Sequence, residues 1–402
     1  MSPTHTSVPV SPRIGRFSYA IRNIVGEAQR VEAQGTKVRY LNVGDPVAFG
    51  FKTPPHLIEA VERALRDGHN GYGPSAGLLA AREAVAAENT AKGWPVHPER
   101  VFITAGTSEG IDLTLSALLD LGDEALVPMP SYPLYTAVIA KTGARPVYYP
   151  TDPGRGWLPD LDRLSALVTP STRVLVIIDP NNPTGATYPT RVRRGLLDLA
   201  DRHGLVILAD EVYGELGYDG PVPPLGSFDP DAPVISLSSL SKAYLAPGWR
   251  TGWLSVGRTP RLDDVAAAIR KLADGRLCST VPMQYAVPAA INGDRSHQRS
   301  FRAALKERAV LTAESLRAIP DVTCMTPTAG FYAMPRIGLP PGRTDQDYVL
   351  GLLRETGVLC VYGSGFGTAP SEGYLRIVFL ASLDELKEIY RLMAEFTAKF
   401  RR

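Results

Sequence analysis

Leu205-Val-Ile-Leu-Ala-Asp210-Glu-Val-Tyr213 is a run of five apolar residues followed by two acidic ones, and no other stretch indicates the fold as clearly. An apolar run without polar alternation is typical of a strand buried on both faces, as in a mainly parallel sheet. The run Val174–Ile178 has the same character. Other short apolar runs alternate with segments of helical periodicity; the runs lie at 101–104, 125–128 and 234–237, and the helices near 107–119, 132–141 and 190–203. The sequence therefore predicts an α/β fold with a large three-layer domain built on a mainly parallel sheet.

The last third of the chain has a different pattern. A charged helix is expected near 298–318, and the final helix begins with the capping pattern Ser382-x-x-Glu385. Its apolar residues recur at helical spacing, which indicates a face packed on a core; they are Leu386, Ile389, Met393, Phe396 and Phe400. Strands are expected near 331–334, 358–361 and 374–379. Segregated helices and short strands predict an α+β domain.

This change of pattern divides the chain into two domains. A length of 402 residues, 44% of them hydrophobic, is enough to build a large domain and a smaller one. We predict a large domain over 50–290 and a small domain over 291–402. The N-terminal segment 1–49 is expected to join the small domain, with its first 13 residues as a loose tail.

Charge and cysteine content exclude several functional classes. The 43 basic and 41 acidic residues give a net charge of +2, which does not favour nucleic acid or a membrane surface as partner. No run approaches the ~20 apolar residues that span a bilayer, and the N-terminus has no signal-peptide pattern. The three cysteines are far apart and predict reduced thiols in a cytoplasmic protein, with no disulfide or metal site.

The segment Ser239-Leu-Ser-Lys242 carries the first chemical signal, with Arg250 eight residues after the lysine at a Gly-Trp-Arg-x-Gly turn. A lysine held in a pocket loses its proton readily and adds to a carbonyl as a Schiff base. An arginine binds phosphate through two parallel hydrogen bonds. An aldehyde and a phosphate in one molecule describe pyridoxal phosphate. A solvated surface lysine fits the same residues, so other segments have to decide between the two.

Three further turns carry polar residues directly after predicted strands. Asp210 ends an apolar run, where an open α/β sheet places its ligand crevice, and a protonated pyridine nitrogen would compensate its buried charge. A helix cap explains an isolated aspartate equally well. Asn182, in Asp-Pro-Asn-Asn182-Pro-Thr-Gly, is not required by turn chemistry and can donate to a ring oxygen. The segment Gly106-Thr107-Ser108 precedes a predicted helix, whose N–H groups can bind phosphate.

Together, and in their order along the chain, the four motifs resemble those of fold-type I, class I pyridoxal-phosphate aminotransferases. The resemblance extends from about Tyr19 to Phe400. The chain is most similar to the alanine aminotransferase branch in a few segments: Tyr19–Arg22, Leu41–Gly44, Gly68–Gly77, Arg276–Cys278 and Tyr362–Gly367. Two positions depart from the family pattern. Ser239 stands where glycine is frequent, and Asp179 stands where asparagine is usual.

The resemblance implies a role for each matching residue. Lys242 would bond to the cofactor aldehyde, Asp210 would pair with the ring nitrogen, and Tyr213 and Asn182 would hold the ring oxygen. Tyr132 would stack on the ring, although an ordinary core aromatic explains it too. The phosphate would be bound by Gly106, Thr107, Ser108, Ser239 and Arg250, and by Tyr72 of a second subunit, which implies a homodimer. Arg376 would bind the substrate α-carboxylate, together with Asn182 and the backbone at Gly44. An outward-facing edge position is the alternative for Arg376.

The implied reaction is ping-pong transamination, most simply between alanine and 2-oxoglutarate, with Lys242 moving the proton. The distal carboxylate of 2-oxoglutarate then needs a cation. The candidates are Arg276, from this chain or a neighbouring subunit, and Arg22, although each fits a structural salt bridge as well. Two alternatives stay open on the same fold: transamination of aspartate, aromatic or other amino acids, and β-elimination by a C–S lyase. A ligand-sensing regulator of this fold would need a DNA-binding module, for which the short tail leaves no room.

Overall fold

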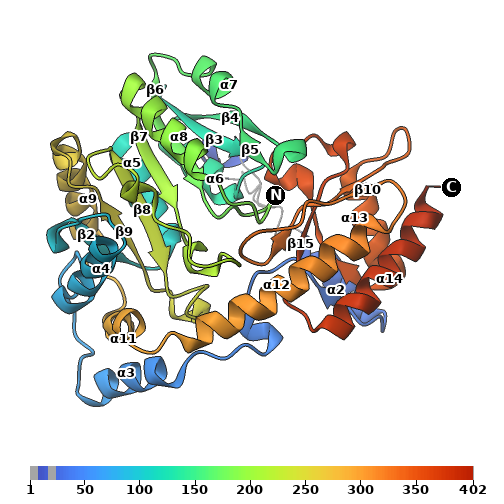
Figure 1. Cartoon of the computed structure of the whole chain (residues 1–402), viewed down its shortest axis with the longest axis horizontal. Helices are drawn as coiled ribbons and strands as arrows, with labels where there is room; N and C mark the ends of the chain where they lie inside the picture. The colour runs from blue at the N-terminus through green and yellow to red at the C-terminus, as the bar shows by residue number, and fades with distance from the viewer. Residues whose placement is uncertain (1–7, 17–23, 402) are drawn as a thin grey trace, which may run out of the picture.

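A computed structural model of the chain describes residues 8–16 and 24–401 (Figure 1). Its large lobe contains an eight-stranded sheet in the order β2-β9-β8-β7-β6-β3-β4-β5. These strands are β2 (Val101–Thr104), β3 (Glu124–Met129), β4 (Arg145–Asp152), β5 (Leu158–Pro159), β6 (Thr172–Ile178), β7 (Val206–Asp210), β8 (Val234–Ser239) and β9 (Gly252–Val256). Strands β8, β7, β6, β3 and β4 run parallel, whereas β9 is antiparallel to both β8 and β2. The predicted mainly parallel sheet is confirmed.

Alternate residues of strand β6 show why the large domain has three layers. Val176 and Ile178 pack in one apolar cluster with residues of α5 (Thr107–Leu118), α6 (Pro133–Thr142) and α9 (Asp263–Gly275). Leu175 and Ile177 pack in the other main cluster, with residues from helices on the opposite side of the sheet. Those helices are α3 (Pro55–Arg66), α4 (Leu79–Ala91), α8 (Thr190–His203) and α11 (Ala286–Asn292). Both faces of the strand are therefore covered, as its continuous apolar sequence predicts.

The smaller lobe is α+β, as predicted. Its helices are α2 (Val25–Ala33), α12 (Ser296–Arg317), α13 (Asp345–Thr356) and α14 (Leu383–Phe400). Antiparallel strands β11 (Tyr332–Ala333), β15 (Leu375–Val378) and β14 (Val361–Tyr362) form one sheet. Two further pairs are β10 (Val322–Thr323) with β12 (Arg336–Ile337), and β1 (Arg39–Tyr40) with β13 (Val358–Leu359). The β1–β13 pair ties the N-terminal segment to this lobe. The domain boundaries themselves stay a prediction.

The final helix packs as its sequence pattern predicts. Leu386, Ile389, Met393 and Phe396 are buried, while Phe400 is partly exposed at the end of the helix. The Ser382 hydroxyl accepts a 3.2 Å hydrogen bond from the Glu385 backbone N–H and so caps the first turn. Short helices complete the chain: α7 (Leu161–Ala166) and α10 (Val281–Gln284), with several 3₁₀ turns.

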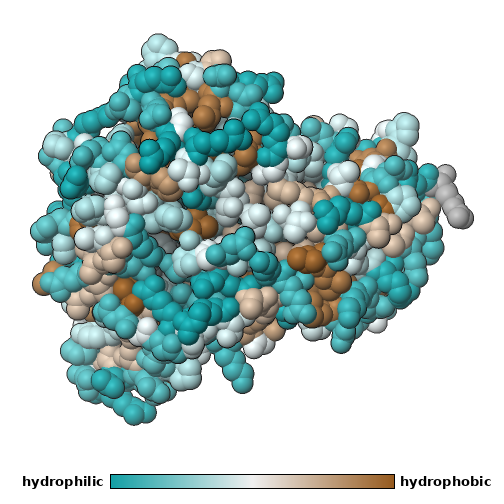
Figure 2. Space-filling view, viewed as in Figure 1, coloured by the Kyte–Doolittle hydropathy of each residue, from teal (hydrophilic) through white to brown (hydrophobic). Residues whose placement is uncertain are grey.

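Helix α12 runs from the large lobe into the small one, where it packs against α14 (Figure 1). On the face drawn in Figure 2, hydrophilic residues predominate over both lobes, and apolar residues gather in small patches. Within the described ranges, no helix has the length and apolar character needed to cross a membrane.

Candidate active site

A cavity of about 670 Å³ lies at the carboxyl ends of the parallel strands. It is lined by the large-domain turns that follow β6, β7 and β8 and by the first residues of α5. Residues of the N-terminal segment and of β15 form the opposite wall. This is the edge at which open α/β sheets bind ligands. The cavity brings together most of the predicted site residues: Gly44, Thr107, Ser108, Tyr132, Asn182, Asp210, Tyr213, Lys242, Arg250 and Arg376.

Lys242 lies in the turn after β8 and points into this cavity. Its Nζ donates a 2.6 Å hydrogen bond to the Gly44 carbonyl and lies 5.6 Å from the centre of the Phe331 ring. Burial lowers the pKa of the Lys242 amine to about 8; the Asp45 carboxylate opposes this shift, and the Arg376 and Arg250 charges reinforce it. Lys242 is therefore a partly buried amine that loses its proton near neutral pH and can act as nucleophile or base. A solvated surface lysine does not fit this environment.

Asp210 closes strand β7 and is 5% exposed. One carboxylate oxygen accepts a 2.9 Å hydrogen bond from the Tyr135 hydroxyl, and the other accepts a 3.3 Å bond from the Val212 N–H. Burial nevertheless raises the pKa of Asp210 to about 6. No described helix starts at this aspartate, since the next helical turn begins at Gly214 with Tyr213 as its N-cap. A cation in the cavity would restore the carboxylate to its ionised form.

The start of helix α5 forms a cradle with Arg250. Gly106 precedes the helix with φ of 76°, and a Cβ added there would overlap the Arg250 guanidinium. A Cβ added at Gly252 would lie 2.8 Å from the backbone N of Thr107. Arg250 also has a left-handed backbone, with φ of 50°, and its guanidinium donates to the carbonyls of Pro247 at 3.0 Å and Ala105 at 3.4 Å. Backbone N–H groups and a guanidinium thus converge, as a phosphate site requires.

Ser239 lies behind this cradle and does not line the cavity wall. It is 1% exposed, and its hydroxyl accepts a 3.2 Å hydrogen bond from the Ser241 N–H. This contact orders the turn that carries Lys242.

Arg376 faces inward from β15 and is 2% exposed, so the edge alternative is wrong. Its guanidinium donates to the Asn182 side-chain oxygen at 3.3 Å and to the Asn42 carbonyl. The rings of Phe366 and Tyr332 lie 4.8 and 5.0 Å from its Cζ atom. A buried guanidinium at a cavity wall is suited to bind a carboxylate.

Three residues of the site have no counterpart in the sequence analysis: Tyr135, Tyr332 and Asp45. The signal for Tyr135 was its position one helical turn after Tyr132. Tyr332 lies in a predicted strand, and its hydroxyl is 2.8 Å from that of Tyr213. Asp45 lines the cavity beside Gly44 and holds the Val47 N–H at 3.0 Å. Only the folded chain shows that each of them reaches the cavity or its charged groups.

Besides Ser239 and Gly106, which stand next to the cavity wall, three more predicted residues are not placed in the cavity of their own chain. Arg276 lies 2.9 Å from Glu109 through its Nε and donates 2.8 Å to the Ile103 carbonyl through Nη2. This is the structural salt bridge considered as its alternative. Tyr72 is 85% exposed on the surface. Arg22 lies outside the described residues.

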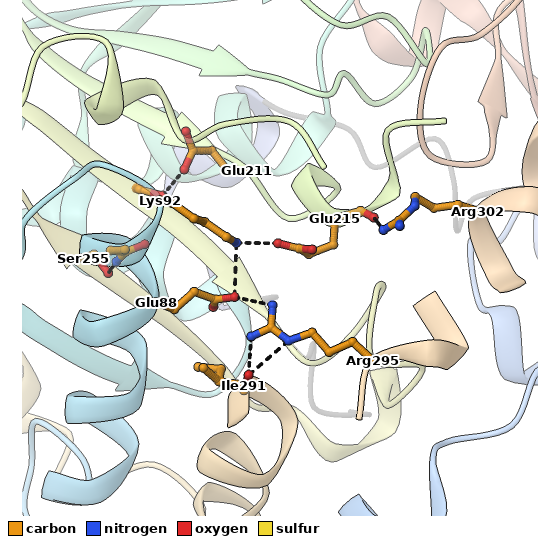
Figure 3. Close-up of polar contacts among 10 residues, drawn as sticks. Glu88, Lys92, Glu211, Glu215, Ser255, Ile291, Arg295 and Arg302 are labelled. Carbon is orange, nitrogen blue, oxygen red and sulfur yellow. Dashed lines mark hydrogen bonds and ion pairs between the residues drawn. The ribbon is translucent and has the colours of Figure 1, made fainter. Parts of the chain in front are cut away.

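A second polar cluster comprises Glu88, Lys92, Glu215 and Arg295 (Figure 3). Lys92 pairs with Glu88 at 3.2 Å and with Glu215, and Arg295 pairs with Glu88 at 2.7 Å. Arg302, within α12, donates a 3.0 Å hydrogen bond to the Glu215 carbonyl. The cluster therefore fastens the first turns of α12 to the large domain. Among the described residues, no three His, Cys, Asp or Glu side chains form a group suited to a metal ion.

Comparison with known proteins places these features in context. A family model described as "Aminotransferase class I and II" matches residues 36–392. The glutamate-pyruvate aminotransferase AlaA of Haemophilus influenzae is 36% identical over 98% of this chain and 99% of its own. The aspartate aminotransferase of Geobacillus stearothermophilus is 30% identical over 92% and 95%. The solved structure of an alanine aminotransferase from Pyrococcus furiosus superposes with a TM-score of 0.94, at 37% identity, over 97% of this chain and all of that chain.

Proposed function

Because the chain belongs to the class I and II aminotransferase family, we propose that it moves the amino group of L-alanine to 2-oxoglutarate and uses pyridoxal 5′-phosphate as cofactor. The family match confirms the family and the type of enzyme that the motifs predict, and the match to a solved aminotransferase structure confirms the fold class. Higher identity to the glutamate-pyruvate enzyme than to the aspartate enzyme supports alanine as amino donor. The structural observation that carries the proposal is one cavity containing the Lys242 amine, with its lowered pKa, and the buried Arg376 guanidinium.

The residues at this cavity fit pyridoxal phosphate. Burial raises the pKa of the Asp210 carboxyl group, and a protonated pyridine nitrogen beside it would lower this pKa again by stabilising the carboxylate. Because Gly106 has no side chain, the Arg250 guanidinium can lie directly beside the backbone N–H groups of the first turn of α5. When bound, the cofactor supplies an aldehyde for Lys242 and a ring that accepts electrons.

Each side chain then has a defined task. Asp210 holds the ring nitrogen proton, and Tyr213 holds the ring oxygen with the Asn182 amide, whose oxygen is engaged by Arg376. Tyr132 covers the ring face. The N–H groups of Thr107 and Ser108 and the Arg250 guanidinium bind the phosphate, with Ser239 ordering the adjacent turn.

Lys242 also moves the proton of the substrate Cα. Burial lowers the pKa of the free Lys242 amine to about 8, close enough to neutrality that the amine can both take up and return a proton. Arg376 holds the α-carboxylate close to Gly44, and this fixes the Cα next to the amine. Because both substrates would use this one site, the reaction has two stages: pyruvate leaves before 2-oxoglutarate binds.

The distal carboxylate of 2-oxoglutarate needs a further cation. Within the described residues, the cationic side chains lining the cavity are Lys242, Arg250 and Arg376, and each has another task. Either Arg22 of the same chain or Arg276 of a second subunit would supply the charge. In a homodimer the exposed Tyr72 of each chain would reach the phosphate in the other chain's site. In Arg22→Ala and Arg276→Ala, a rise in KM for 2-oxoglutarate that spares pyruvate identifies the residue. Glu109→Gln is the control, because it breaks the Arg276 ion pair and keeps the arginine.

The decisive experiment follows the visible absorption of the purified protein after incubation with pyridoxal phosphate, then with alanine alone, then with 2-oxoglutarate. The proposal expects a visible band that alanine removes and 2-oxoglutarate restores, with pyruvate and glutamate as products. Lys242→Ala should lose both the band and turnover. With a β-thio amino acid such as cystathionine in place of alanine, continued release of a thiol, pyruvate and ammonia without any keto acid would instead indicate a lyase. A Lys242→Ala variant with near-normal transamination would overturn the proposed role of the lysine.

A further inference from the structure

We infer that Tyr332 is a positioning residue with two separable parts: its hydroxyl orients Tyr213 towards the cofactor, and its ring supports the carboxylate-binding Arg376. This inference rests on the proposed function and assigns a task to a residue outside the predicted set. Tyr332 lines the cavity, and only 3% of it is exposed.

The hydroxyl part starts from the 2.8 Å contact between the Tyr332 and Tyr213 oxygens. Only one of the two hydroxyl groups donates in that bond. When Tyr332 donates, the Tyr213 proton is left for another acceptor, and the ring oxygen that Tyr213 is proposed to hold is such an acceptor. The two rings meet edge to face with centroids 5.5 Å apart, which fixes the direction of both phenols. With Tyr332 as the donor in this contact, Tyr213 keeps its own proton for the cofactor.

The same hydroxyl lies against the segment that binds Lys242. A Cβ added at Gly44 would overlap the Tyr332 hydroxyl, and the Gly44 carbonyl accepts the Lys242 hydrogen bond. Tyr332 thus touches the residues on both sides of the reacting atoms: Tyr213 on the cofactor side and Gly44 on the substrate side.

The ring part of Tyr332 faces Arg376. The Arg376 Cζ atom lies 5.0 Å from the ring centre, within cation–π range. Both residues stand on paired strands, since β11 and β15 match Tyr332 with Val378 and Ala333 with Ile377. The pairing of β11 with β15 fixes the position of the Tyr332 ring relative to the Arg376 guanidinium. Without the ring, the guanidinium would lose this support and could turn away from the substrate carboxylate.

These two parts predict different defects. Tyr332→Phe keeps the ring and removes the hydroxyl. The Tyr213 hydroxyl then loses the hydrogen bond that polarises it and donates more weakly to the ring-oxygen anion, so the pKa of the bound cofactor's visible band should rise by about half a pH unit, less than the loss of one whole neutral hydrogen bond would cause. The KM for alanine should stay within about twofold. Tyr332→Leu removes the ring as well, and it should also raise the KM for alanine about fivefold or more.

A double variant shows whether Tyr332 acts through Tyr213. If it does, Tyr213→Phe with Tyr332→Phe should have the same band pKa as Tyr213→Phe alone. Tyr218→Phe is the matched control, because this neighbouring tyrosine donates 2.8 Å to the Gly330 carbonyl and does not line the cavity. It should leave both the band and the KM unchanged. Urea unfolding of every variant confirms that each one is folded.

The outcomes separate the inference from the proposed function. A wild-type protein without a visible band contradicts the function itself. A normal wild-type band combined with an unchanged pKa in Tyr332→Phe overturns the inference and leaves the function standing. Additive pKa shifts in the double variant would also overturn it, since Tyr332 would then act independently of Tyr213.

Discussion

The Tyr135 hydroxyl donates a 2.9 Å hydrogen bond to the Asp210 carboxylate, across 75 residues of sequence and between helix α6 and strand β7. Both groups are almost completely buried. Burial is the main reason for the raised pKa of Asp210, and this hydrogen bond opposes the rise. Tyr135 therefore helps to keep Asp210 ionised at neutral pH, which is the state that would hold a protonated ring nitrogen.

Removing this hydroxyl should weaken cofactor binding. In Tyr135→Phe the pKa of Asp210 rises further, and we expect the affinity for pyridoxal phosphate at pH 7 to fall about tenfold or more. Fluorescence titration of the cofactor-free protein measures this. Tyr149→Phe is the control, because that buried hydroxyl bonds the Val176 carbonyl at 2.8 Å. Equal losses in both variants would contradict a specific effect on Asp210.

The buried Asp210 should also destabilise the cofactor-free protein. Its pKa is about 6 in the folded chain, against 3.8 for an ordinary aspartate, so the folded state binds the proton more tightly. Folding stability from this group therefore falls as pH rises from about 4 to 6, and the loss at pH 7 is roughly 3 kcal/mol. Without cofactor, Asp210→Asn should unfold at a higher urea concentration than wild type at pH 7.5, with a smaller gap at pH 5. With pyridoxal phosphate present, the order should reverse. An Asp210→Asn variant that unfolds at the same or a lower urea concentration than wild type at pH 7.5 without cofactor would show that the buried carboxylate does not destabilise the fold.

The phosphate cradle gives a test based on geometry. Gly106→Ala places a methyl group against the Arg250 guanidinium at a backbone φ of 76°. We expect at least about tenfold weaker binding of pyridoxal phosphate. Pyridoxal, which has no phosphate, should bind equally to both proteins. Gly35→Ala is the control for backbone strain alone, since Gly35 has φ of 87° and nothing within 4 Å of an added Cβ. A similar loss for pyridoxal would place the effect elsewhere.

The cluster that fastens α12 should contribute to stability. Burial alone would lower the pKa of Lys92, but the Glu88 and Glu215 carboxylates outweigh it and raise the pKa. The two ion pairs of Lys92 therefore stabilise the fold around neutral pH; the contribution is lost in strongly alkaline solution, where the lysine loses its proton, and in acid, where carboxylates are protonated. Lys92→Met should lower the free energy of unfolding at pH 7 by about 1–2 kcal/mol, between the values for exposed and buried pairs. Lys306→Met, which breaks an exposed 2.8 Å pair with Asp219, should have almost no effect.

Local sequence pattern predicted the elements whose burial is complete. Strands β6 and β7 contain the unbroken apolar runs Val174–Ile178 and Val206–Ala209, so their place inside the sheet follows from composition. Strand β9 was not predicted, because Gly252–Val256 directly follows the turn at Arg250 and has no break that marks a strand. Strand β4 carries two prolines and is mostly exposed or half-exposed, a pattern that does not resemble a buried parallel strand.

The candidate site was predictable where a residue's task depends on its own segment. Lys242, Asp210 and Asn182 each follow a strand, and the sheet alone brings their turns to one edge. Arg276 shows the limit. Its guanidinium is paired with Glu109, a residue far away in the sequence, and no spacing pattern reveals that contact. Tyr332 was missed for the same reason, since its partner Tyr213 is 119 residues away, whereas Tyr135 had a spacing signal relative to Tyr132 but no sign of its contact with Asp210.

The antiparallel pairing of β8 with β9 has a consequence for how the site can vary. Ser239 and Gly252 are opposite each other in that ladder, so the loop that carries Lys242 and Arg250 is held at both ends. The distance between Lys242, the proposed attachment point, and the Arg250 guanidinium, the proposed phosphate ligand, is thereby set by the number of residues in one closed loop. An insertion or deletion there would change this distance without replacing either residue, so we expect the length of the loop 240–251 to tolerate change less than most of its individual residues do.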